Sequence, residues 1–211
     1  GNIAGYEVQY QIAQTLVSKV YLVNQGRDAL KLSRARNYGW EQEYLEKVFR
    51  NEIRITKELS QYPCFPDFVD SGECEEGLFL VMGMLQGYEM TRYFTRENKK
   101  DGFLKNTMTA LRNLAVALDT IHLLGILHKD VKRDNVYYNP ETYDITLFDF
   151  SISCYGEIDE IDGESILYVK ENSLRGTPKS MAPEQFKKPI ISTQQSDIFS
   201  FGVMACYILA E

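Results

Sequence analysis

The pattern of apolar residues changes character near residue 87, and this change constrains the fold more than any other feature. Before it, short segments alternate apolar and polar residues or are rich in β-branched and aromatic ones, which is typical of strands. After it, the apolar patterns reach helical length. Strands followed by helices favour an α+β fold. We therefore predict a strand-rich lobe over residues 1–86 and a helical lobe over residues 87–211.

The strand-rich lobe is predicted to contain five strands and one helix. The strands span residues 6–12, 19–23 and 28–33, with two more inside residues 67–85. Apolar residues approximate one helix face over residues 44–59, and Pro63 and Pro66 then break the chain. An acidic turn that contains glycine joins the last two strands.

The helical lobe begins with a long predicted helix over residues 103–125, for which Gly125 is the expected C-cap. Short strands are predicted within residues 135–139 and 144–150. The acidic segment 156–165 shows little pattern, so we expect a solvated loop. The apolar run 198–210 is too short for a bilayer and predicts a buried core helix. Because the sequence stops inside that helix, we expect a fragment of a longer chain.

Composition and charge limit the partners. The chain is 44% hydrophobic and 25% charged, which is ordinary for a globular protein long enough to bury a core. A net charge of −7 argues against broad attraction to nucleic acid or anionic lipid. We expect no nucleic-acid partner and no membrane segment here. Four scattered cysteines without metal-ligand spacing, and the lack of a secretory signal, favour free thiols in a reducing compartment and a cytoplasmic location.

The segment LHKDVKRDN, residues 127–135, concentrates two aspartates and three basic groups between a predicted helix and a strand. A solvated turn would carry such charges by chance. The spacing of His128, Asp130, Lys132 and Asn135, however, matches the H-x-D-x-K-x-x-N catalytic loop of protein kinases.

Further segments match the same family in the same order. The sequence DFS at 149–151 stands where the family has D-F-G, and GTPKSMAPE at 176–184 resembles the end of its activation segment. SDIFSFGV at 196–203 resembles the start of the helix that follows. Ala29-Leu30-Lys31 fits the V-A-I-K strand, and residues 78–90 resemble the last N-lobe strand and the hinge.

The chain therefore resembles the eukaryotic-type Ser/Thr protein kinases. The resemblance implies a bilobal fold with N-lobe 1–86 and C-lobe 87–211, truncated after the helix that follows A-P-E. It also implies that the remainder of the parent chain packs on this fragment.

The resemblance implies a catalytic role for four residues. Lys31 would hold the α- and β-phosphates of ATP and Glu52 would hold Lys31, while Asp130 would accept the proton of the substrate hydroxyl. Lys132 would steady the transferred phosphate. Taken alone, Lys31 could equally be a strand lysine that reaches solvent, and Glu52 a solvated helix residue.

The resemblance also implies a site for ATP and Mg²⁺. Asn135 and Asp149 would be the metal ligands, since Mg²⁺ prefers hard oxygen donors. The residues implied to contact the nucleotide are Ala13, Thr15, Ser18, Val20, Ala29, Lys31, Met82, Gly83, Leu85 and Glu89. Among these, Met82 could instead be core and Glu89 a surface carboxylate.

Lys132 and the Gly176-Thr177 pair fit the serine/threonine subclass. We therefore predict a protein kinase that transfers the ATP γ-phosphate to a Ser or Thr hydroxyl of a protein substrate. One alternative is a pseudokinase that acts as a nucleotide-binding or scaffolding module. Another is a kinase-fold enzyme with a different phosphoryl acceptor.

Three departures from the family separate these alternatives. Its glycine-rich phosphate loop, G-x-G-x-x-G, aligns with residues 13–18, which contain no glycine and have a stiff Leu16-Val17 tip, so we expect weaker nucleotide binding or a reshaped lid. Ser151 replaces a glycine. Lys129 replaces an arginine that often pairs with a phosphorylated activation segment, which leaves that dependence open. Carboxylates of residues 156–165 could replace phosphate charge or attract basic substrates.

Overall fold

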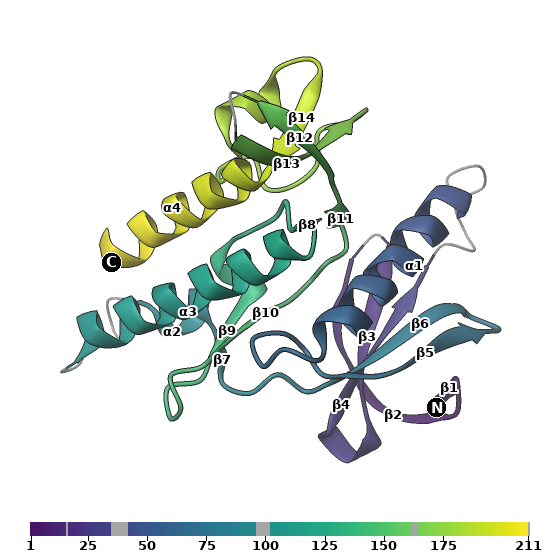
Figure 1. Ribbon diagram of the computed structural model, residues 1–211. Helices are drawn as coiled ribbons and strands as arrows, with labels where there is room; N and C mark the ends of the chain where they lie inside the picture. Colours follow the sequence, from purple (N-terminus) through teal and green to yellow (C-terminus); the bar gives the residue numbers. More distant parts are fainter. Residues whose placement is uncertain (16, 35–41, 96–101, 162–163, 211) are drawn as a thin grey trace. The chain divides into compact units, whose positions relative to one another are not determined.

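The computed structural model of the chain describes residues 1–15, 17–34, 42–95, 102–161 and 164–210. The chain forms two compact units, Gly1–Leu85 and Gln86–Glu211. Each unit contains both strands and helices, so the fold is of the mixed α+β type (Figure 1). Among the described residues, no helix combines the length and the apolarity that a bilayer crossing requires.

The first unit is built on a six-stranded antiparallel sheet in the order β1-β2-β3-β4-β6-β5. Its strands are β1 (Asn2–Ile3), β2 (Tyr6–Gln14), β3 (Ser18–Val23), β4 (Asp28–Ser33), β5 (Phe68–Cys74) and β6 (Gly77–Gly83). The 3-10 turn η1 (Asn24–Gly26) joins β3 to β4. The alternating segments in the sequence thus form strands close to where they were predicted.

The two faces of this sheet bury different partners because successive strand residues point to opposite faces. One face holds a core of five residues, Val23, Leu30, Leu32, Phe79 and Val81. Helix α1 (Gln42–Leu59) covers the opposite face, packing against β5 and β6 (Figure 1). Phe49 of α1 forms a second core there with Leu78 and Leu80. The helix therefore buries apolar residues on one face of the sheet, and the five-residue core lies on the other face.

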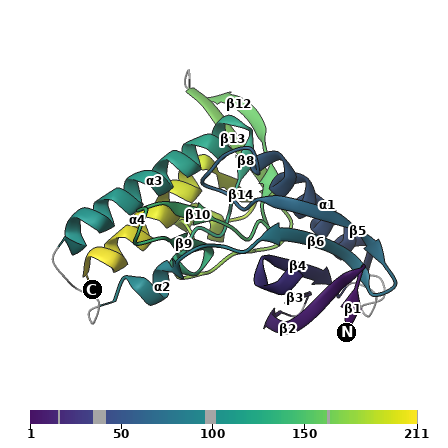
Figure 2. The same ribbon diagram turned by 90° about the horizontal axis from the view of Figure 1, so that it is seen from below.

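The second unit is dominated by two long helices, α3 (Phe103–Leu123) and α4 (Gln194–Ala210), which lie side by side (Figure 2). Gly125 lies two residues beyond α3 with φ +74° and donates its amide to the carbonyl of His122, as a helix-terminating glycine does. Its shorter helices are α2 (Met90–Tyr93) and the 3-10 turns η5 (Arg133–Asn135) and η6 (Pro183–Phe186).

Three small antiparallel sheets complete the second unit. The first joins β7 (Tyr88–Glu89), β9 (Val136–Tyr138) and β10 (Ile145–Leu147), and the second joins β8 (Ile126–Leu127) to β11 (Cys154–Tyr155). The third has the order β12-β13-β14, with β12 (Glu157–Ile161), β13 (Glu164–Glu171) and β14 (Ile190–Thr193). Residues 128–135 form the loop that leads from β8 of the second sheet to β9 of the first.

The prediction of a solvated loop over residues 156–165 is wrong about the loop, although residues 157–160, 164 and 165 are exposed. Residues 157–161 form β12, which pairs along its length with β13, and β13 pairs in turn with β14. The reason lies just downstream, where Ile166, Leu167, Tyr168 and Val169 favour a strand and offer β12 a partner. Residues 162–163 lie outside the described part of the chain.

The prediction of a buried core helix over residues 198–210 is right about the helix and wrong in part about its burial. Helix α4 packs against α3, β13 and β14, yet Ile198, Phe199, Tyr207 and Leu209 are 42–54% exposed. Apolar residues surround the whole helix, and these neighbours cover only part of its circumference.

Candidate active site

In the first unit, Lys31 of β4 and Glu52 of α1 form a buried ion pair. Lys31 Nζ lies 2.6 Å from Glu52 Oε1, and their side chains are only 11% and 4% exposed. The pairing excludes the alternative that both residues simply reach into solvent. A buried lysine needs such a counter-charge, so α1 holds the lysine at a fixed place on the sheet.

Four residues predicted to contact the nucleotide lie on the same face of the sheet as Lys31. Cross-strand pairing places Val20 opposite Lys31, Ala13 opposite Val20, and Ala29 opposite Met82. Residues that are paired across strands, or two apart along one, share a face. Met82 also packs against the core between α1 and the sheet. Four of the predicted nucleotide contacts are thus gathered beside the lysine.

The turn between β2 and β3, where the family has its glycines, is closed by the side chain of Thr15. Thr15 Oγ1 accepts hydrogen bonds from the amides of Val17 at 3.3 Å and Ser18 at 3.0 Å, and it lies 3.0 Å from Ser18 Oγ. Arg34 donates to the carbonyl of Thr15 from the end of β4. The hairpin therefore persists without glycine, but two of its tip amides are already engaged. Leu16 lies outside the described residues.

The residues predicted at the hinge lie near the end of the first unit and the start of the second. The amide of Gly83 donates to the carbonyl of Asp67 at 2.9 Å, and Leu85 is the last residue of the first unit. Glu89, in the second unit, forms a 3.2 Å ion pair with Arg92 and lies half-buried on β7. A role for Glu89 with ribose stays a prediction.

In the second unit, the catalytic-loop residues converge on the carboxylate of Asp130. Lys132 Nζ donates to Asp130 Oδ2 at 2.6 Å, and Asn135 Nδ2 donates to the same oxygen at 3.1 Å. Asn135 also donates to the carbonyl of Asp130 at 2.9 Å, which fixes the curve of the loop. Thr177 Oγ1 donates to the second oxygen, Oδ1, at 2.7 Å and accepts from Lys132 at 3.1 Å. The sequence placed Thr177 in the family pattern but did not predict these contacts.

The two predicted metal ligands lie on adjoining elements of this unit. Asn135 is buried at the end of η5, and the amide of Phe148, next to Asp149, donates to its carbonyl at 3.0 Å. Asp149 has φ +63°, a conformation that a non-glycine residue adopts only where its surroundings hold it. An amide oxygen and a carboxylate are a donor set suited to Mg²⁺. Ser151 is not among the described residues with positive φ, so serine fits there without that strain.

His128 is a structural histidine rather than an acid or base. It is fully buried, and burial is the main cause that lowers its pKa below 6.5, against the opposing effect of Asp197 and Asp130. Its Nε2 lies 3.2 Å from the carbonyl of Phe148, and its Nδ1 accepts from the amide of Asp130. These partners require a neutral ring protonated on Nε2. The ring of Phe150 packs on it at 5.1 Å between centroids.

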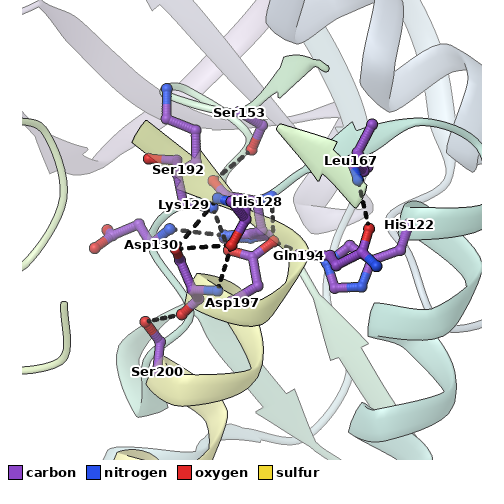
Figure 3. A network of polar contacts seen from close by, with 12 residues as sticks. His122, His128, Lys129, Asp130, Ser153, Leu167, Ser192, Gln194, Asp197 and Ser200 are labelled. Carbon is purple, nitrogen blue, oxygen red and sulfur yellow. Dashed lines mark hydrogen bonds and ion pairs between the residues drawn. The ribbon is translucent and has the colours of Figure 1, made fainter. Parts of the chain in front are cut away.

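The residue that supports the catalytic loop from below was missed by the sequence analysis. Asp197, in the first turn of α4, is buried, and its two oxygens accept from the amides of His128 and Lys129, both at 2.8 Å (Figure 3). His122 Nε2 lies 3.0 Å from the same carboxylate. An acidic residue in an otherwise apolar helix was the available signal, because such a charge is buried only with partners.

Lys129, which stands where the family often has arginine, forms a buried ion pair. Its Nζ lies 2.6 Å from Glu171 Oε1 of β13, and the two side chains are 6% and 10% exposed. Gly176 explains how the chain passes so close to this loop: it has φ +112°, and a Cβ there would lie 2.8 Å from the carbonyl of Lys129. The charge facing Lys129 thus comes from Glu171, outside the acidic run 156–165.

Comparison with known proteins agrees with this geometry. The family described as "Protein kinase domain" matches residues 6–211. The phosphorylase b kinase gamma catalytic chain, liver/testis isoform, of Rattus norvegicus is 29% identical over 176 residues, which is 80% of this chain and 40% of the relative. Serine/threonine-protein kinase CST20 of Candida albicans (strain WO-1) is 27% identical over 203 residues, 94% of this chain and 15% of the relative.

A further similar protein is serine/threonine-protein kinase MST20 of Pyricularia oryzae, 28% identical over 179 residues, which is 85% of this chain and 18% of the relative. The matched part of the chain therefore spans between 15% and 40% of the length of these relatives.

Proposed function

Because this chain belongs to the protein kinase domain family, we propose that it is the catalytic part of a serine/threonine protein kinase. The observation that carries the proposal is the arrangement around Asp130: one carboxylate contacted by a lysine, an asparagine and a threonine hydroxyl. The names of the similar proteins support the serine/threonine class. The substrate would be a Ser or Thr hydroxyl of a protein.

The residues of the second unit would carry the transfer itself. Bound Mg-ATP supplies a γ-phosphoryl group whose negative charge the metal partly neutralises. Asp130 accepts the proton of the substrate hydroxyl as that oxygen bonds to phosphorus and ADP leaves. Lys132, already directed at this site, stabilises the negative charge of the transferred group. Asn135 and Asp149 would hold the metal through oxygen atoms.

The residues of the first unit would bind the nucleotide. Lys31, fixed by Glu52, contributes a buried positive charge that suits the α- and β-phosphates. Val20 and Ala29 are apolar residues on the same face as Lys31 and would line the adenine pocket. Ala13, opposite Val20, would lie at the phosphate loop. N-lobe 1–86 and C-lobe 87–211 are the corresponding functional division.

A specific observation favours the second candidate, a pseudokinase that binds nucleotide weakly or acts as a scaffold. Thr15 Oγ1 already accepts from the amides of Val17 and Ser18. Backbone amides of such a turn are the groups that cradle phosphate oxygens, and here two of them have an internal partner. Retention of Asp130, Asn135 and Asp149 favours the active enzyme over this alternative.

The deciding experiment measures γ-phosphate transfer from Mg-ATP to the full-length protein itself and to a generic basic protein. We expect transfer by the wild type and a loss of at least about 100-fold in Asp130→Asn, because the proton acceptor is removed. Asp134→Asn, a loop aspartate four residues on, is the matched control. Absence of transfer, or equal transfer in the Asp130 variant, would overturn the proposal. Thermal stabilisation by Mg-ATP without transfer would then support the pseudokinase.

A further inference from the structure

We propose, resting on the kinase function above, that three exposed lysines near Asp130 select protein substrates in which acidic residues flank the phosphoacceptor. Lys179, Lys187 and Lys188 are all exposed, and together they are called the basic surface. Residues 172–188 contain four cations and one carboxylate, although the whole chain has a net charge of −7. The basic surface is thus a local exception to the acidic character of the chain.

Lys179 lies in a tight turn that begins at the candidate active site. The carbonyl of Thr177 accepts from the amide of Ser180 at 2.9 Å and from the hydroxyl of Ser180 at 3.1 Å. Thr177 Oγ1 in turn donates to Asp130 Oδ1 at 2.7 Å. The first and last Cα atoms of such a turn are within about 7 Å of each other. Lys179, which lies between them, is therefore held close to the carboxylate that would accept the substrate proton.

The start of α4 supports both Lys187 and the catalytic loop. The amide of Lys187 donates to the carbonyl of Glu184 at 3.1 Å, and Ser196 Oγ donates to Glu184 Oε1 at 3.0 Å. Asp197, the residue after Ser196, accepts from two amides of the catalytic loop, both at 2.8 Å. Lys188 follows Lys187 in the chain. The backbone of these two lysines is thus tied to the same helix turn that holds the catalytic loop.

The charges of the basic surface are available to a ligand. Within the described part of the chain, none of its three lysines forms an ion pair with another residue. Glu184, the one carboxylate of residues 172–188, already accepts from Ser196. A lysine is a point charge with three donors on a flexible stem, so it can meet carboxylates at several positions of a bound segment. The ligand that this chemistry favours is an acidic peptide segment.

The acidic strand β12 lies too far from the start of β14 to neutralise the lysines that precede it. Ile190, two residues after Lys188, pairs with Glu171, whereas Glu157 of β12 pairs with Tyr168, three residues back along β13. At about 3.4 Å per residue and about 4.8 Å between strands, Glu157 lies more than about 10 Å from Ile190. Salt screens exposed charges over about 8 Å at physiological ionic strength. The carboxylates of β12 therefore leave most of the positive charge of Lys187 and Lys188 uncompensated.

The test measures kcat/KM of the full-length protein for three peptides that carry one central serine flanked on both sides by aspartates, alanines or lysines. We expect the aspartate peptide to exceed the alanine peptide at least about fivefold, and the lysine peptide to be phosphorylated most slowly. The preference should shrink as NaCl rises from about 0.05 M to about 0.5 M, because salt screens the charges. A lysine peptide phosphorylated as fast as the aspartate peptide would overturn the proposal.

Charge reversal then assigns the preference to the basic surface. In Lys179→Glu, and in the double variant Lys187→Glu/Lys188→Glu, kcat/KM for the aspartate peptide should fall at least about fivefold. The value for the alanine peptide should stay within about twofold, and arginine at the same positions should preserve the preference. Lys105→Glu, at an exposed position of α3, is the matched control and should change nothing. A reversal that slows all three peptides equally would mean that the lysines are merely structural, and the proposal would fail.

Peptide binding in the absence of ATP separates this proposal from the proposed function. Fluorescence anisotropy should give a Kd for the labelled aspartate peptide at least about fivefold below that for the lysine peptide, and the double variant should abolish the difference. If the wild type binds in this way but transfers no phosphate, the kinase function fails and the basic surface stands. If the wild type binds the two peptides equally or not at all, the basic surface fails whatever the activity.

Discussion

Each unit contains a lysine and a glutamate buried against each other at 2.6 Å, but the two pairs are assembled differently. Lys31 meets Glu52 because a helix with a regular apolar stripe packs across a regular sheet. Lys129 meets Glu171 because an acidic segment folds into a hairpin beside β14. The first pair lies in elements whose own sequence pattern is strong. The second depends on strand pairing between distant segments, and so it is visible only in the fold.

The two ion pairs also differ in the elements that surround them. The pair in the first unit is buried between β4 and α1, on the sheet face that also carries Val20 and Ala29. In the second unit, the Lys129–Glu171 pair joins the loop 128–135 to β13, and Ser192 donates to the same carboxylate. The first pair therefore joins a strand to a helix, whereas the second joins a loop to a strand.

The largest expected effect is the loss of stability when the glutamate of either ion pair is removed, and it tests whether both pairs are buried in solution. Glu52→Ala and Glu171→Ala should each lower the free energy of unfolding by about 3–5 kcal/mol, because each leaves a buried lysine without its counter-charge. Urea denaturation of the full-length protein measures this. Glu73→Ala is the control: its ion pair with Arg50 is well exposed, and its loss should cost about 1 kcal/mol or less. A loss for Glu171→Ala no larger than this would mean that the second pair is not buried.

A smaller effect is expected on the affinity of the first unit for Mg-ATP. Thr15→Gly should strengthen Mg-ATP binding about fivefold, since it releases the amides of Val17 and Ser18 for phosphate oxygens at about 1 kcal/mol. Titration calorimetry measures the Kd. Thr15→Ser keeps the hydroxyl and should bind like the wild type, and glycine added at 13 and 18 should extend the gain. Equal affinity in Thr15→Gly and Thr15→Ser would show that the turn does not limit binding.

The smallest effect concerns pH, and it belongs to the second unit because both histidines of the chain lie there. The pKa of His128 is lowered by burial, so the folded state binds fewer protons than the unfolded state below pH 6.5. This contribution to stability is present above pH 6.5 and is lost as the pH falls toward the lowered pKa. We expect a loss of at most about 1 kcal/mol between pH 7.0 and 5.5. His128→Gln should flatten this part of the stability–pH curve; an unchanged slope would contradict the assignment.

The sequence predicts well where local pattern and family spacing agree. The strands around Lys31, the helix that carries Glu52, and the spacing from Asp130 to Asn135 all belong to short segments that specify themselves. Asp197 and Glu171 were missed because their importance comes from partners far away in the chain. Helix α4 was predicted as a buried core helix because its apolar run 198–210 does not indicate which side its neighbours cover. The strand β12 was hidden because its acidic residues outweighed the partner that β13 provides.

The position of β12 affects the association of the protein with other copies of itself. β12 is an edge of the β12-β13-β14 sheet, and its outer backbone groups form a template on which another chain could add a strand. Glu157, Asp159 and Glu160 lie exposed along it, next to an exposed Ile158. A second copy that approached this edge would bring the same negative charges against them. The acidic residues therefore keep this exposed edge from joining one copy of the protein to the next, and high salt would weaken that protection because it screens the charges.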